Sequence, residues 1–377
     1  MEDWWFHVFE NLEAPIDFRS LGLTCKKSYA MLQHHRKKLA NCRHLERLLR
    51  HFPDKGWNWE KITENPGITW DIVKKHFVFE TRDKFPLGVP FVYSNISRLV
   101  KIETIKENPD IPWCWNSISQ NPNIGWDIIQ QHPEFEWNLI FFSSNQSLRS
   151  NIVQNNLHLE WSWFRLSCNR SISFDLIRSN PLLKWDWEIL SENPIITWDI
   201  IQQNPDLPWN LSWFSRNPNV HIEIVLQYPD VPWFWLWLSE NPSITEKDIQ
   251  ENPGLPWKWD RVSENTSISW TLVQSNLDKN WSWPQLSKNP SVPTWEIVKQ
   301  NPNLKWHWWA LSGNPSVATW EIVKGNPDYP WDWKYLSQNP SFVTWEIVKQ
   351  NPDAPWDWNS FSVNTFNVKR PKHTNSR

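Results

Sequence analysis

Aromatic and aliphatic positions recur along most of this chain in one fixed order, separated by polar residues and prolines. The unit reads W-x-W-x-x-L-S-x-N-P-x-I-T-W-[DE]-I-[IV]-x-x-N-P-D-x-P. Its W-x-W marker, or a version with one tryptophan, returns every 24 residues from Trp113 to Trp281 and every 25 residues from there to Trp356. The extra residue of the longer units always precedes the second-half tryptophan, which indicates a loop. Periods of about 20 to 50 residues are typical of solenoids.

Each unit consists of two similar halves that follow the order cap, Trp, x, x, aliphatic, x, x, Asn, Pro. Caps such as Asn58, Ser162 and Asp332 in first halves, or Thr197 and Ser269 in second halves, can accept hydrogen bonds from a helix's first turn. Proline removes a backbone donor and pushes the preceding residue out of helical geometry. Each half is therefore predicted to be a helix of roughly seven residues, with Trp and the aliphatic residue on one face.

A β-strand at W-x-W is the alternative interpretation, because alternate residues point to one side of a sheet. The stretch "TWEIVKQNP" has helix caps and adjacent rather than alternating aliphatic residues, so it favours a helix. We predict an all-α solenoid of short helix pairs over residues 51–368, preceded by a helical N-terminal cap in residues 1–50. The rhythm breaks at about residues 76–112, which indicates a degenerate unit with an insertion.

Two polar features have expected places in this array. Asn-Pro occurs 15 times, and each Asn side chain is predicted to accept from the backbone N–H two residues on, so that the turns stack along one edge. Glu246 stands where a second-half tryptophan belongs. It is therefore expected to face the core and to weaken the fold locally.

Residues 1–50 contain neither Asn-Pro nor W-x-W and are helical in pattern. The stretch "VFENLEAPIDFRSLGLTCKKSYAML" has an aliphatic helix, a short turn at proline, then Asp and spaced aliphatic residues up to Cys-Lys and an aromatic. The matching residues are Phe9, Leu12, Pro15, Asp17, Phe18, Leu21, Leu23, Cys25, Lys26 and Tyr29. This stretch resembles an F-box, although Trp5-Phe6 stands where the usual opening Leu-Pro would be. The resemblance implies docking on the Skp-family linker of a cullin-type ubiquitin ligase; the alternative is that this segment only caps the solenoid.

The repeats from about residue 57 to 368 resemble Trp- and Asn-Pro-rich repeat proteins of large DNA viruses, which also have F-box-plus-repeat proteins. This resemblance implies a viral origin and a host cell as the setting, more than an activity. The variable positions of the helices are mostly Gln, Lys, Glu, Asn and Ser, which is typical of a surface that holds a protein partner. We therefore expect a protein-interaction scaffold, a monomer whose target the sequence does not name.

The composition and charge of the chain indicate which partners and which cellular location to expect. With 38 Lys and Arg against 41 Asp and Glu, the net charge of −3 gives no argument for a nucleic acid or an anionic membrane as partner. No signal peptide and no long apolar stretch is recognisable, and the four cysteines form no CxxC pair, so a cytoplasmic or nuclear location is expected. The basic tail 369–377, with Lys369, Arg370 and Lys372, is either a nuclear import signal or simply solvated.

The sequence has no catalytic or metal-binding motif such as GxSxG, GxxxxGK[ST] or HExxH, so we predict neither an enzyme, a cofactor nor a metal site. Extra aromatic residues at variable positions are expected to form an exposed strip on neighbouring units: Trp213, Trp237, Trp309 and Tyr335. Exposed indoles stack on sugars and prolines. Carbohydrate or proline-rich peptide binding is therefore the alternative function, and extra packing is the alternative role of these residues.

Overall fold

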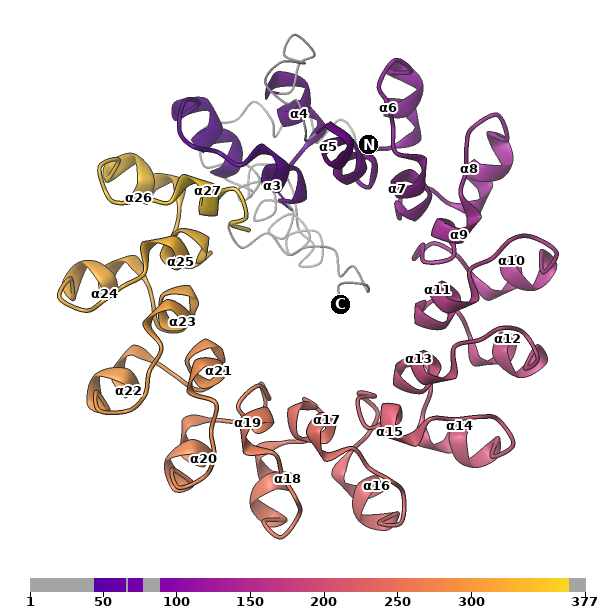
Figure 1. Ribbon diagram of the computed structural model, residues 1–377. Coiled ribbons are helices and arrows are strands. Elements are labelled where there is room, and N and C mark those ends of the chain that lie inside the picture. The colour runs from indigo at the N-terminus through magenta and orange to yellow at the C-terminus, as the bar shows by residue number, and fades with distance from the viewer. Residues whose placement is uncertain (1–43, 66, 77–88, 366–377) are drawn as a thin grey trace, which may run out of the picture.

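The computed structural model describes residues 44–65, 67–76 and 89–365 of the 377-residue chain. All secondary structure in these residues is helical, and no strand occurs among them. The helices alternate between an inner and an outer row around a ring (Figure 1). The predicted all-α solenoid of short helix pairs is therefore confirmed, and the solenoid is bent into a circle.

The inner row consists of the first-half helices, which carry odd numbers (Figure 1). They are α3 (Trp59–Glu64), α5 (Val89–Ser97), α7 (Trp115–Gln120), α9 (Leu139–Phe142), α11 (Trp163–Cys168), α13 (Trp187–Glu192), α15 (Leu211–Phe214), α17 (Trp235–Glu240), α19 (Trp259–Val262), α21 (Trp283–Lys288), α23 (Trp308–Gly313), α25 (Trp333–Gln338) and α27 (Trp358–Phe361). Most successive members of this row, such as α11 and α13 or α21 and α23, pack directly against each other.

The outer row consists of the second-half helices (Figure 1). They are α4 (Trp70–His76), α6 (Ile102–Glu107), α8 (Trp126–Gln131), α10 (Ser150–Asn155), α12 (Phe174–Ser179), α14 (Trp198–Gln203), α16 (Ile222–Gln227), α18 (Glu246–Glu251), α20 (Trp270–Ser275), α22 (Trp295–Gln300), α24 (Trp320–Gly325) and α26 (Trp345–Gln350). A helix over residues 44–51 precedes α3. None of these helices is long and apolar enough to cross a membrane, as far as the described residues extend.

The caps expected from the sequence are present. Asn58, Ser162 and Asp332 accept hydrogen bonds from backbone N–H groups in the first turns of α3, α11 and α25. Thr197 and Ser269 do the same for α14 and α20. Because these helices have only six residues, a satisfied N-terminus is a large part of their local stability.

Tryptophans join successive units. The first tryptophan of W-x-W is buried in most units, and its indole N–H donates to the backbone carbonyl five residues earlier, as Trp161 does to Asn156 at 2.8 Å. Its ring also meets the second tryptophan of the preceding unit edge-on, as in Trp163–Trp185, where the ring centroids are 5.0 Å apart. Edge-to-face contacts of this kind are favourable beyond the area they bury.

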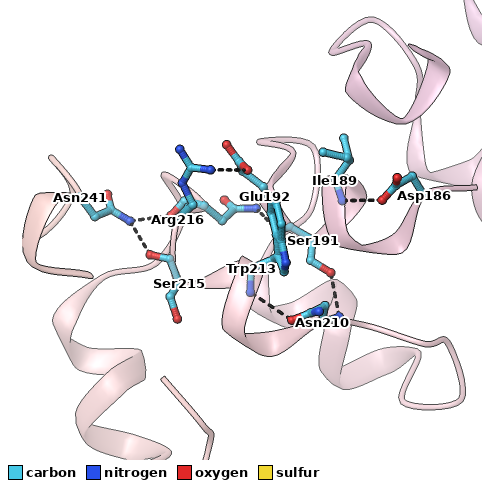
Figure 2. Close-up of polar contacts among 10 residues, drawn as sticks. Asp186, Ile189, Ser191, Glu192, Asn210, Trp213, Ser215, Arg216 and Asn241 are labelled. Carbon is cyan, nitrogen blue, oxygen red and sulfur yellow. Dashed lines mark hydrogen bonds and ion pairs between the residues drawn. The ribbon is translucent and has the colours of Figure 1, made fainter. Parts of the chain in front are cut away.

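A buried serine and a buried asparagine at the ends of most inner helices link the units by hydrogen bonds, a role that the sequence did not reveal. Ser191 Oγ accepts from the backbone N–H of Asn210 at 3.0 Å, at the start of the next inner helix (Figure 2). The Asn217 side-chain amide donates to carbonyls of the preceding unit, including Ser191 at 2.9 Å and Asn193 at 2.9 Å. Its oxygen accepts from the N–H of Asn219, two residues on, which is the predicted turn.

The asparagines of the outer helices behave differently from this prediction. The side-chain amide of Asn204 donates to the Ile200 carbonyl of its own helix at 2.8 Å, and its backbone carbonyl accepts from the Trp209 indole at 2.9 Å. The predicted turn bond is therefore a property of the first-half asparagines. In the second half, the asparagine instead satisfies carbonyls at the helix end.

The ring closes through the same contacts that join neighbouring units. Ser362 Oγ accepts from the Asn58 N–H at 2.9 Å, although the two residues are 304 positions apart. The Asn65 side-chain amide donates to the carbonyls of Ser362 at 3.0 Å and Asn364 at 2.8 Å. We call this contact between α27 and α3 the seam (Figure 1).

The outer row also continues across the seam. His44 Nδ1 accepts from the Trp345 N–H at 3.1 Å, and Arg47 lies 3.8 Å from Glu346. The helix over residues 44–51 therefore occupies the place of an outer helix beside α26. Residues 44–50 of the predicted N-terminal segment thus belong to the ring, and its residues 1–43 lie outside the described part of the chain.

Two places where the sequence departs from the repeat still form the same helix pairs as the other units. The stretch of broken rhythm supplies one inner helix, α5, and one outer helix, α6, and Ser97 Oγ of α5 accepts from the Cys114 N–H at 3.1 Å, as the repeat serines do. The expectation that Glu246 faces the core is wrong, because its side chain is only partly buried. Its carboxylate accepts from the Ser269 N–H of the next outer helix at 2.7 Å.

Candidate functional site

The surface of the inner helices that faces away from the outer row differs from unit to unit. In α13, positions one, four and five (Trp187, Leu190 and Ser191) pack into the ring, and position two, Glu188, is exposed. At about 100° per residue, positions two, three and six lie together on the opposite side of the helix. We call these positions, in all inner helices, the inner wall.

An aromatic pair with an arginine and a carboxylate occupies the inner wall from α13 to α17. The ring centroids of Trp213 and Trp237 are 5.2 Å apart. The guanidinium of Arg216 lies over the Trp237 ring, 5.2 Å from its centroid, and its Nη1 is 3.2 Å from Glu192 Oε2. Figure 2 shows Glu192, Trp213 and Arg216 side by side above the framework bond from Ser191 to Asn210. The wall can thus hold a guanidinium between a carboxylate and an indole face.

The next units continue the wall with a second arginine. Arg261 of α19 lies between Glu240 of α17, at 3.6 Å, and Glu264 in its own unit, at 3.4 Å. Gln285 of α21 donates to Glu264 at 3.4 Å. These side chains are partly exposed, so each ion pair contributes little to stability. They extend the polar part of the wall over two further units.

The predicted exposed strip consists of two separate pairs. Trp213 contacts Trp237, and Trp309 contacts Tyr335 at a centroid distance of 5.3 Å, while α19 and α21 lie between the pairs. Among the tryptophans of the described residues, Trp309 is the exposed one, at 40%. The other three predicted residues are partly buried.

Two apolar side chains that the sequence did not single out are exposed on the wall. Ile140 of α9 is 45% exposed and Phe164 of α11 is 57% exposed. Both occupy position two of their helices. Their signal in the sequence is an apolar residue directly after the second-tryptophan position, where several other units have Glu, Asp or Asn.

Two cysteine thiols of the inner row have shifted pKa values. Burial raises the pKa of the Cys168 thiol at the end of α11, and the carboxylates of Asp186 and Glu192 raise it further. For Cys114, burial acts in the same direction, but hydrogen bonds with Ser117 and Ser94 outweigh it, and the pKa is lowered. No group of three or more His, Cys, Asp or Glu side chains suited to a metal ion occurs within the described ranges.

The F-box-like residues (Phe9, Leu12, Pro15, Asp17, Phe18, Leu21, Cys25 and Lys26) and the basic tail 369–377 lie outside the described residues. Comparison of the chain with protein-family models, curated proteins and solved structures finds no match. The candidate site is therefore defined by its own geometry, as a row of variable side chains on a regular inner surface.

Proposed function

We propose that this protein is a non-enzymatic interaction scaffold that holds a protein partner on the inner wall of its ring. The observation that supports the proposal is that repeated and variable residues of an inner helix lie on different sides of it. The residues that repeat, such as Leu190, Ser191 and Asn193, are buried in packing and hydrogen bonds between units. The residues that vary, such as Glu188 and Phe164, are exposed. A constant framework with a variable surface is how solenoids recognise proteins.

Photo-crosslinking at matched positions tests where a partner sits. A photoreactive amino acid replaces Glu188 or Asp260 on inner helices, or Asp199 or Glu223 on outer helices, in the full-length protein expressed in its host cell. All four are exposed residues at position two of their helices, so the substitutions perturb equivalent places. One protein crosslinked from both inner positions and from neither outer position is the expected result. Crosslinks confined to the outer positions would refute the proposal.

In the same proposal, the F-box-like segment links the scaffold to a cullin-type ubiquitin ligase. Binding of purified Skp-family linker to the immobilised full-length protein tests this part directly. Leu12→Asp combined with Leu21→Asp should abolish binding, whereas Leu182→Asp, at a side chain that is 98% exposed, should not change it. Point substitutions are preferable to deleting residues 1–50, because Leu45, Leu48 and Leu49 are fully buried in the ring. Failure of the unaltered protein to bind the linker would leave residues 1–43 without this role. The viral resemblance of the repeats and the basic tail would place this assembly in the cytoplasm or nucleus of a host cell.

Carbohydrate or proline-rich peptide binding is a second candidate, favoured by the exposed Trp309 and its contact with Tyr335. An indole face that meets water can stack on a sugar or a proline ring. Intrinsic fluorescence measured across a glycan panel and a proline-rich peptide should then change for the unaltered protein and not for Trp309→Ala. An unchanged spectrum with every ligand would exclude this candidate.

A further inference from the structure

We propose that the inner wall from α13 to α19 binds a basic, extended segment of a partner protein. This inference rests on the proposed scaffold function and specifies the chemistry of the partner. An aromatic group lies on this part of the wall. Trp213 and Trp237 are in contact there, and Phe234, the residue before α17, packs on Trp237 at a centroid distance of 4.6 Å and is 42% exposed.

The charge of this arc indicates the kind of occupant. Residues 187–264, from the start of α13 to the last wall position of α19, include 12 acidic and four basic side chains, a net charge of −8, whereas the whole chain has a net charge of −3. The rest of the chain is therefore positive by 5. Such a concentration of like charge disfavours the compact state unless an oppositely charged group meets it. An acidic partner segment would be repelled from this arc.

Part of the acidic excess lies on the inner wall itself: Glu188, Glu192, Glu240, Asp260 and Glu264. The basic residues at wall positions of the same arc are Arg216 and Arg261, and both are already paired with these carboxylates. Glu188 and Asp260, near the starts of their helices, suit the positive end of the helix dipole. Glu192, Glu240 and Glu264 stand at the other end, where the dipole disfavours a carboxylate, and their partners within the ring are Arg216 and Arg261.

Arg216 shows how the wall receives a guanidinium. It lies over an indole ring and reaches a carboxylate at 3.2 Å, and both interactions come from neighbouring units. Arginine or lysine side chains of a partner would meet the same two kinds of group at Glu188, Asp260 and the aromatic group. Packed helices lie about 8–10 Å apart, and an extended chain advances about 3.3 Å per residue. Roughly three residues would therefore pass each unit, and a segment of about 12 residues would span these four inner helices.

The test uses fluorescence anisotropy with the full-length protein and two labelled 12-residue probes, four Arg-Pro-Leu repeats and four Glu-Pro-Leu repeats. The basic probe should bind at low salt and weaken as salt rises, and the acidic probe should not bind. Equal binding of the two probes, or no binding of the basic one, would overturn the proposal. If the basic probe fails to bind while the inner positions still crosslink a partner, the scaffold function stands and only this partner chemistry is wrong.

Matched variants then locate the site. Two triple variants each remove three negative charges from the same arc: Glu188→Gln, Glu240→Gln and Asp260→Asn on the inner wall, and Asp199→Asn, Glu223→Gln and Asp230→Asn in the outer part. The inner triple variant should weaken binding of the basic probe about tenfold, and the outer one less than about twofold. Equal losses would mean that general attraction, not the wall, binds the peptide. Thermal unfolding curves confirm that both variants are folded.

One further variant tests whether the chain's own basic tail, rather than a partner segment, occupies the inner wall. Replacing Lys369, Arg370 and Lys372 by Ala should leave the affinity for the basic probe unchanged. A clear gain in affinity would mean that the tail occupies the wall, and the proposal of a partner segment would be overturned.

Discussion

If the ring is closed at the seam, a substitution at Ser362 should change the local opening of the chain around Asn58, whereas in an open solenoid it should not. Ser362→Ala removes the hydroxyl that accepts from the Asn58 N–H at 2.9 Å, across 304 residues of sequence. Ser362 is fully buried, so water cannot easily take the place of the lost oxygen. Leaving a buried donor without a partner costs about 1–3 kcal/mol. At 1.4 kcal/mol per factor of ten, the opening equilibrium around Asn58 should rise roughly 5- to 150-fold.

Native-state hydrogen exchange read by mass spectrometry measures this opening. In Ser362→Ala, amides in the peptide around Asn58 should exchange faster, while the interior units should keep their protection. Ser143→Ala is the matched control, because Ser143 Oγ accepts from the Ser162 N–H at 2.9 Å within the array. It should speed exchange near Ser162 by a similar factor. If Ser362→Ala leaves the exchange of residues 57–65 unchanged, the ring is open in solution.

Three further outcomes follow from single side chains. Burial lowers the pKa of His44, against an opposing effect of Glu346, and its unprotonated Nδ1 accepts from the Trp345 N–H. Because the unfolded chain binds the proton more readily, the free energy of unfolding should fall as the pH drops below about 6.5. His44→Gln should remove this part of the pH dependence. Iodoacetamide should alkylate Cys114, whose pKa is lowered, faster than Cys168, whose pKa is raised, as peptide mapping would show, and equal rates would contradict this. Glu246→Ala should lower the free energy of unfolding by about 1–3 kcal/mol in chemical denaturation, because the Ser269 N–H loses its acceptor, and a neutral effect would contradict that role.

Short-range features of the sequence predict much of this fold. The caps, the proline stops and the spacing of Trp and aliphatic residues each act within one helix, and they predict the helix pairs and their boundaries. The Ser191–Asn210 and Asn217–Ser191 bonds join residues 19 and 26 positions apart. They were not predicted because a serine in an amphipathic pattern reads as a tolerated small residue. Its recurrence in nearly every unit, directly after a buried Leu, Ile, Phe or Val, is the signal that could have revealed them.

The candidate site was predictable only in part. The four extra aromatics were recognised as variable positions, but their grouping into two pairs depends on which helices are neighbours and how they are rotated. The ion pairs of Arg216 and Arg261 cross between units, so their partners cannot be read from adjacent sequence. Closure was also beyond the sequence, because it depends on a small rotation per unit that accumulates over the whole array.

Closure explains why the irregular stretches keep their helices. A head-to-tail interface forms a ring only when the rotations of all units sum to a full turn, and otherwise it leaves two unsatisfied ends. Losing one helix pair would part α27 from α3, whereas extra residues in a connection leave the rotation unchanged. In the described residues, the added residue of the longer units lies in such a connection, as between α21 and α22, and the broken-rhythm stretch still supplies α5 and α6. The connections between helices can therefore vary in length, whereas the number of helix pairs is fixed because α27 must meet α3 at the seam.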